Sequence, residues 1–191
     1  MHEVITVQKF SENEWLIDGL FEGNPEASNI VIMLHEGGYN KDENGLFPVI
    51  EENTIKKENN KIVFQTKTYG NYEILANSLT KNTEFATFRY DLRNHNKSIV
   101  NDTMDKRDTL YLRLAKDLRD VIKYLKNKYP FKKIYFVGTG VGALVIEYYL
   151  TKVREIPLDS IKQIYLICPN SPKIIYNLNP KYPFSYQKQE F

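Results

Sequence analysis

The amino-acid sequence predicts an α/β protein with a mostly parallel, twisted β-sheet that carries helices on both faces. Three features of the 191-residue chain lead to this prediction. The continuous apolar run from Ile30 to Leu34 is typical of a strand that is buried on both faces. Leu110 to Tyr129 has the apolar periodicity of a helix. Ile134 to Val137 is a further buried strand, and it leads directly into a glycine-rich turn.

The first two strands of the predicted sheet differ from the later ones. Apolar and polar residues alternate from Glu3 to Phe10, which indicates a strand with one buried face. Trp15 to Phe21 is predicted to be its partner, across a turn at Ser11 to Glu14. The turn-forming sequence Gly23-Asn24-Pro25 separates this pair from the buried strand that follows.

A polar stretch from Tyr39 to Tyr69 then interrupts the pattern, either as an insertion or as a hairpin. Within it, Thr54 to Thr66 is either a hairpin around Asn59-Asn60 or a solvated loop, and the sequence leaves both open. Tyr72 to Leu79 is predicted to be a short amphipathic helix, and Phe85 to Tyr90 a strand. The polar segment 101–108 is expected to be a loop.

The second half of the chain continues the alternation. Pro130 ends the long helix, whose apolar face consists of Leu114, Leu118, Val121, Ile122 and Leu125. A helix from Val141 to about Lys152 follows the glycine turn, and Ile161 to Cys168 is a further strand. The resulting order β-α-β-α-β-α-β favours a parallel sheet. We expect one core domain over residues 1–170, and a tail or the start of a lid over residues 171–191.

Composition limits the classes of function. A hydrophobic fraction of 42% and a charged fraction of 26% are typical of a globular protein. The net charge of +2 does not indicate binding to nucleic acid or to a membrane. One cysteine, Cys168, excludes an internal disulfide, and with no recognisable signal peptide the expected location is the cytoplasm. No cofactor is expected, and no His or Cys spacing indicates a metal site.

The glycine turn has the spacing of a nucleophile elbow, G-x-S-x-G, between a strand and a helix. Its sequence is Gly138-Thr139-Gly140-Val141-Gly142. The outer glycines are expected because a side chain there would push the strand and the helix apart. The central position, where a serine nucleophile belongs, is Gly140. Thr139 precedes the apex and is expected to point into the structure instead of acting as a substitute nucleophile.

Two further motifs each begin directly after a predicted strand, as the glycine turn does. His35-Glu36-Gly37-Gly38 follows the strand at residues 30–34, and a D-x-R-x-H-x-x-S sequence from Asp91 to Ser98 follows the strand at residues 85–90. Together with the elbow, this order resembles the α/β-hydrolase fold, particularly its lipase, esterase and aminopeptidase-like branch. The resemblance covers about residues 1–170, the first six strands of that fold.

The resemblance implies roles for these residues. Gly37, Gly38 and Val141 become candidates for the backbone N–H groups of an oxyanion hole. Glu36 stands where the family has glycine, and a carboxylate there would oppose a developing oxyanion unless it points away. In the second motif, Asn94 and Asn96 replace glycines, and asparagine tolerates the left-handed conformation. That loop, with Asp91, Arg93 and Ser98, is mainly structural in the family.

The resemblance also implies residues that are missing from this sequence. The family places its acid and its catalytic histidine after the elbow, but the three histidines of this chain are His2, His35 and His95. His35 is therefore expected to bond local backbone and not to act as a base or a metal ligand. We expect a protein derived from a serine ester or amide hydrolase that is catalytically inactive in this form. It would be a pseudoenzyme, a truncated chain or half of a split enzyme.

Two alternatives remain open at this point. The remnant cleft above Gly140 would allow a module that binds a small acyl or ester-like ligand without cleaving it. Alternatively, Gly138, Gly140 and Ala143 fit the G-x-G-x-x-G/A pattern of a nucleotide- or S-adenosylmethionine-binding loop, although no acidic residue ends the next strand.

The strand from Ile161 to Cys168 is apolar, so we also expect it to pair with a second copy or with a complementing chain.

Overall fold

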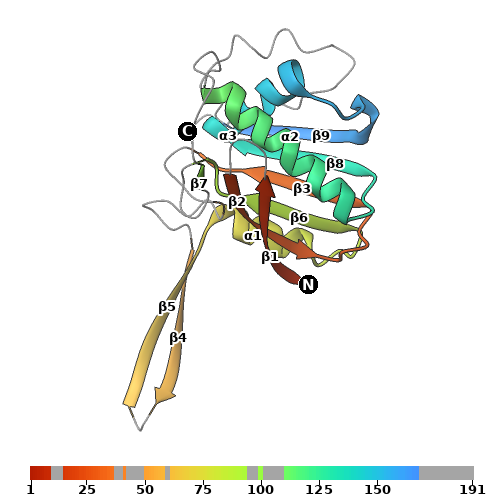
Figure 1. Ribbon diagram of the computed structural model, residues 1–191. Coiled ribbons are helices and arrows are strands. Elements are labelled where there is room, and N and C mark those ends of the chain that lie inside the picture. Colours follow the sequence, from red (N-terminus) through yellow and green to blue (C-terminus); the bar gives the residue numbers. More distant parts are fainter. Residues whose placement is uncertain are drawn as a thin grey trace.

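The computed structural model describes residues 1–9, 15–36, 41, 50–58, 61–93, 99–100 and 110–167. A single sheet with strand order β1-β2-β6-β3-β8-β9 forms its centre (Figure 1). β1 (His2–Lys9) and β2 (Trp15–Gly23) form an antiparallel pair at one edge. β3 (Asn29–Leu34), β6 (Phe85–Tyr90), β8 (Lys133–Thr139) and β9 (Ile161–Ile167) form the parallel part. This confirms the predicted fold class.

Helices cover both faces of the sheet, as the alternation of elements predicted. α2 (Leu110–Lys128) and α3 (Val141–Tyr148) lie on one face, and α1 (Asn71–Leu79) lies on the other (Figure 1). The central strand β3 contributes to both cores. Ile30, Ile32 and Leu34 belong to the cluster under α2 and α3, whereas Val31 and Met33 pack with Tyr72 and Ala76 of α1. The continuous apolar run of β3 is thus explained by burial on both faces.

One expectation from the sequence needs correction, and two short elements come in addition to the predicted ones. A two-residue strand, β7 (Ile99–Val100), pairs with β2 and was not predicted. The helix after the glycine turn is α-helical only to Tyr148, and a π-helical turn, η1 (Tyr149–Val153), replaces its predicted last turn. There the Thr151 hydroxyl donates to the Glu147 carbonyl (2.8 Å), a side-chain bond that competes with regular helical bonding. A 3₁₀ turn, η2 (Leu158–Ser160), precedes β9.

The polar insertion contains a hairpin, which decides between the two alternatives. β4 (Ile50–Glu58) and β5 (Lys61–Tyr69) pair along their whole length around residues 59–60, so the hairpin is longer than the predicted 54–66. It forms a separate two-stranded sheet that projects away from the main sheet (Figure 1). It is inserted between the end of β3 and the start of α1.

The predicted loop at 101–108 and the predicted tail at 171–191 lie outside the described residues. Residues 168–170, which include the predicted last residue of the final strand, also lie outside them. Within the described ranges, no helix combines the length and apolar character that crossing a lipid bilayer requires.

In the described part of the sheet, β9 is an edge strand that carries exposed apolar side chains. Val137 pairs with Tyr165 and Thr139 with Ile167, and paired residues of neighbouring strands point to the same face. Tyr165 and Ile167, 39% and 47% exposed, therefore lie on the face that α1 covers over other strands. Exposed apolar edge strands favour pairing with further strands.

We propose that β9 pairs with a second copy of the chain or with a complementing chain. The double substitution Tyr165→Lys and Ile167→Lys should then weaken association, because two positive charges would be buried at the interface. Sedimentation equilibrium of both proteins over a hundredfold range of concentration measures the effect. Lys81→Glu, an exposed change distant from β9 in sequence, serves as the control. A wild-type protein that is monomeric throughout and gains no partner when cell extract is added would contradict the proposal.

Candidate functional site

The nucleophile-elbow motif forms a tight turn between β8 and α3. Gly140 lies at its apex with φ +45° and ψ −107°, a conformation that side chains of L-residues rarely adopt. The Gly140 N–H donates to the Ile167 carbonyl (3.0 Å), and the Leu144 N–H donates to the Gly140 carbonyl (3.2 Å). The apex is therefore fixed between the end of β9 and the first turn of α3.

The two outer glycines are required by close packing, as the sequence predicted. A Cβ atom on Gly138 would lie 2.8 Å from the Ala143 nitrogen and 2.6 Å from Cδ1 of Ile146. A Cβ atom on Gly142 would overlap the carbonyl oxygen of Leu34 and approach the Leu34 Cβ atom to 2.8 Å. Both glycines thus allow α3 to begin directly against the ends of β8 and β3.

The carboxylate of Glu36 occupies the space in which a side chain at position 140 would begin. A Cβ atom built on Gly140 would overlap Oε2 and Cδ of Glu36, and it would lie 2.8 Å from Oε1. Any side chain at position 140 therefore meets this carboxylate first. The carboxylate points toward the elbow, which is the orientation that opposes a developing oxyanion. Its place beside the start of α3 is favourable, since a helix N-terminus stabilises negative charge.

His35 is buried and bonds to backbone on both sides. Its Nε2 accepts a hydrogen bond from the Leu92 N–H (2.9 Å), so Nδ1 carries the proton and donates to the Glu36 carbonyl (2.6 Å). Both ring nitrogens thus join the end of β3 to the segment after β6. The expected backbone role of His35 agrees with this geometry.

The hydroxyl of Tyr72 in α1 makes contacts near the elbow that the sequence did not predict. It donates to the Leu34 carbonyl (2.8 Å) and lies 3.3 Å from Oγ1 of Thr139. Thr139, directly before the apex, is thereby turned toward α1 and away from the position of a nucleophile. Tyr72 was placed on an amphipathic helix, a pattern that indicates burial but does not identify a partner for the hydroxyl.

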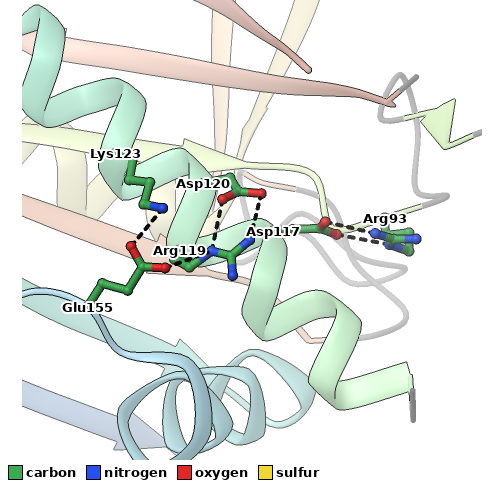
Figure 2. Close-up of polar contacts among 6 residues, drawn as sticks. All are labelled: Arg93, Asp117, Arg119, Asp120, Lys123 and Glu155. Atoms are coloured by element: carbon green, nitrogen blue, oxygen red, sulfur yellow. Dashed lines mark hydrogen bonds and ion pairs between the residues drawn. The ribbon is translucent and has the colours of Figure 1, made fainter. Parts of the chain in front are cut away.

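The D-x-R motif anchors the segment after β6 to other elements. Asp91 is fully buried; its Oδ1 accepts a hydrogen bond from the Lys41 N–H (2.7 Å), and its Oδ2 lies 3.6 Å from Lys41 Nζ. Arg93 donates two hydrogen bonds to Asp117 of α2, from Nε to Oδ2 (2.9 Å) and from the terminal nitrogen to Oδ1 (2.8 Å) (Figure 2). Such a bidentate pair supports the structural role that the resemblance implies.

A second group of ion pairs in Figure 2 joins α2 to the segment after η1. Glu155 lies 2.6 Å from Lys123 Nζ and 3.7 Å from Arg119 Nε, and Arg119 also pairs with Asp120 (2.9 Å). About half of the Lys123 and Glu155 side chains is exposed, so these pairs contribute little to stability. They lie apart from the elbow and have no part in the candidate site.

Several candidate residues cannot be placed. Gly37, Gly38, Ser98, His95 and Cys168 lie outside the described residues, so their predicted roles stay predictions. Val141 is the first residue of α3. Like the other N–H groups in the first turn of a helix, its N–H has no acceptor within the helix itself. In the described part of the chain, no group of three or more His, Cys, Asp or Glu side chains is arranged to hold a metal ion.

The comparisons with known proteins agree with this geometry. Residues 24–167 match the model of a family described as alpha/beta hydrolase of unknown function (DUF915). The chain belongs to this family. No curated protein matches it at a significant level. The identification confirms the resemblance that the three motifs predicted.

Solved structures show the same fold at low sequence identity. An esterase from Pyrococcus furiosus is 20% identical with a TM-score of 0.53, and the match covers 82% of this chain and 47% of the esterase. An esterase from Exiguobacterium antarcticum is 18% identical (TM-score 0.53; 84% and 43%). An alpha/beta hydrolase from a Penicillium species is 13% identical (TM-score 0.58; 88% and 46%). The chain thus spans about half the length of these hydrolases.

The Arg93–Asp117 pair allows a test of how the segment after β6 is held to α2. Arg93→Met should destabilise the protein by about 3 to 5 kcal/mol, because it removes both charge-assisted hydrogen bonds that Arg93 donates to the buried Asp117 carboxylate. The double variant Arg93→Met with Asp117→Leu should recover much of this loss. Urea unfolding of both variants measures the difference, with Lys123→Met as a control in an exposed pair. Equal losses in the single and the double variant would contradict the pairing.

Glu147, buried near the end of α3 about two turns after Gly140, gives a test of pH dependence. Its carboxylate oxygens have no hydrogen-bond partner among the described residues, and burial raises its pKa to about 7. The folded protein therefore holds a proton that the unfolded chain releases near pH 4.5. This contribution to stability is full below pH 4.5 and decreases as the pH rises through 7.

The melting temperature of the wild type should therefore fall between pH 5 and pH 8 by more than that of Glu147→Gln. Glu147→Gln should also melt higher than the wild type at pH 8. Differential scanning calorimetry measures both values. Parallel profiles for the wild type and Glu147→Gln would show that Glu147 is ionised in the folded protein.

Proposed function

We propose that this protein is an α/β-hydrolase-fold protein derived from a serine ester or amide hydrolase that does not hydrolyse esters in this form. The observation that carries the proposal is the apex of the elbow, where glycine stands in place of the nucleophile. A triad needs a hydroxyl or thiol at this point, because the bond to the acyl group forms there. Residues elsewhere in a longer chain could supply an acid and a base, but not an apex side chain.

Two further contacts support the proposal. The Glu36 carboxylate lies where an acyl carbonyl would approach, and its negative charge opposes the charge of a tetrahedral intermediate. His35, the histidine next to it in sequence, uses both ring nitrogens on backbone groups. His35 is therefore not arranged to take a proton from a hydroxyl at position 140, and Glu36 opposes the charge that the reaction would develop there. The proposal does not depend on where the chain ends, since these groups all belong to the described part.

The same carboxylate argues against the nucleotide-binding alternative. A dinucleotide-binding loop places the pyrophosphate at the N-terminus of the helix that follows it. In this protein the Glu36 carboxylate already lies beside the start of α3. A pyrophosphate there would add negative charge next to a carboxylate at close range. Binding of a small acyl ligand without cleavage remains the second proposal for the use of this scaffold.

The purified protein should show no turnover of p-nitrophenyl acetate or butyrate above the buffer rate. Loss of a triad nucleophile lowers kcat by about 10⁶-fold, and further losses in the triad do not add to it. Gly140→Ser should also release no burst of product, because His35 bonds backbone groups through both ring nitrogens and the Glu36 carboxylate beside the new hydroxyl opposes the charge of the intermediate. It should melt lower than the wild type, since φ +45° is strained for serine.

Labelling with a fluorophosphonate, which reacts with activated serines, gives an independent measurement. Neither the wild type nor Gly140→Ser should be labelled, and a known serine esterase in the same reaction serves as the positive control. Ester turnover that follows the wild-type protein through successive purification steps would refute the proposal. Labelling of Gly140→Ser alone would show that a base does reach the elbow.

A further inference from the structure

The backbone that carries Glu36 is held from three directions. The Tyr72 hydroxyl bonds the Leu34 carbonyl, and the same carbonyl packs against Gly142 at the start of α3. One residue further, His35 joins the Glu36 carbonyl to the Leu92 N–H. The end of β3 is therefore fixed on both sides of the sheet, and the direction in which Glu36 leaves the strand is fixed with it.

The side chain of Glu36 ends at the apex of the elbow. Two atoms of its carboxyl group, Oε2 and Cδ, coincide with the volume of a Cβ atom on Gly140. The overlap involves the end of a side chain and not backbone. It therefore depends on the identity of residue 36, which makes it testable by substitution.

We propose that Glu36 replaces the nucleophile side chain as the group that fills the apex, so that a glutamate at position 36 and a side chain at position 140 compete for the same volume. In this arrangement Glu36 is a blocking residue. It takes the space of the nucleophile and brings a negative charge to the place where an acyl carbonyl would react. This inference deepens the proposed function, and it rests on Gly140 being the nucleophile position.

A cysteine at the apex can report on the blocking group directly. Cys168 is the single native cysteine, so the probe is Gly140→Cys in a Cys168→Ser background. The rate of its alkylation by iodoacetamide at pH 8 is measured with Glu36, with Glu36→Gln and with Glu36→Gly. A neighbouring carboxylate raises the pKa of a thiol by about one unit, which lowers its thiolate fraction about tenfold.

We expect the Glu36→Gly background to react about tenfold faster than the Glu36 background or more, because both the charge and the bulk are removed. Glu36→Gln keeps the bulk and removes the charge, so its rate divides the effect into electrostatic and steric parts. Lys81→Cys, an exposed position on the loop after α1, is the matched control in the same Cys168→Ser background. Its rate should be the same with Glu36 and with Glu36→Gly.

A second measurement requires no thiol. Gly140→Ala should lower the melting temperature in both backgrounds, because the strained φ remains. The decrease should be smaller with Glu36→Gly than with Glu36 by about 3 °C or more, because the overlap with the carboxylate is gone. If the alkylation rates are equal in all three backgrounds and the decreases in melting temperature are also equal, Glu36 does not block the apex.

These readouts separate the inference from the proposed function, since neither measures turnover. Ester hydrolysis by the wild type would refute the proposed function. The alkylation rates and melting temperatures would still decide whether residues 36 and 140 compete for the same space. Conversely, an absence of coupling would refute the blocking role while the ester assay still decides whether the chain is a hydrolase.

Discussion

The close approach of the Leu34 carbonyl to Gly142 is the contact on which the candidate site depends. It places the end of β3 directly against the first turn of α3, with no space for a Cβ atom between them. Residue 36 is therefore brought to the apex of the elbow, although it lies more than one hundred positions away in sequence. Gly138 makes the corresponding approach between β8 and α3 possible. The geometry of an elbow is thus retained around an apex that has no side chain.

The segments that follow β3 and β6 are held by buried polar contacts. His35 links the two segments through backbone groups, Asp91 bonds Lys41, and Arg93 pairs with Asp117 of α2. Each of these side chains satisfies groups that burial would otherwise leave without water, which is the condition for keeping charge inside a protein. In the described residues, the polar side chains at this edge of the sheet fix the chain.

Retention of the fold and the proposed loss of the nucleophile are physically compatible. Serine at a strained apex destabilises the folded state, and glycine removes this cost because it adopts positive φ freely. Once glycine is present, the volume above it is available to another side chain. The carboxylate of Glu36 uses it, beside a helix start that favours negative charge. The two departures from the hydrolase pattern, at positions 36 and 140, are therefore parts of one arrangement.

The sequence by itself determined the main strands and helices of the parallel sheet, the position of the glycine turn and the need for its outer glycines, whereas it left the hairpin at 50–69 open and gave no sign of β7. These features follow from apolar periodicity and from local backbone geometry, which depend on residues close together in the chain. Tertiary structure alone decided what the Glu36 carboxylate faces, which partner Arg93 takes, and where the helix after the elbow becomes a π-turn. The sequence does indicate that Asp117 is buried, since it lies one turn from Leu114 on the apolar face of α2. Its partner, however, comes from a distant segment of the chain. Contacts of this kind depend on how the elements pack, and periodicity carries no information about them.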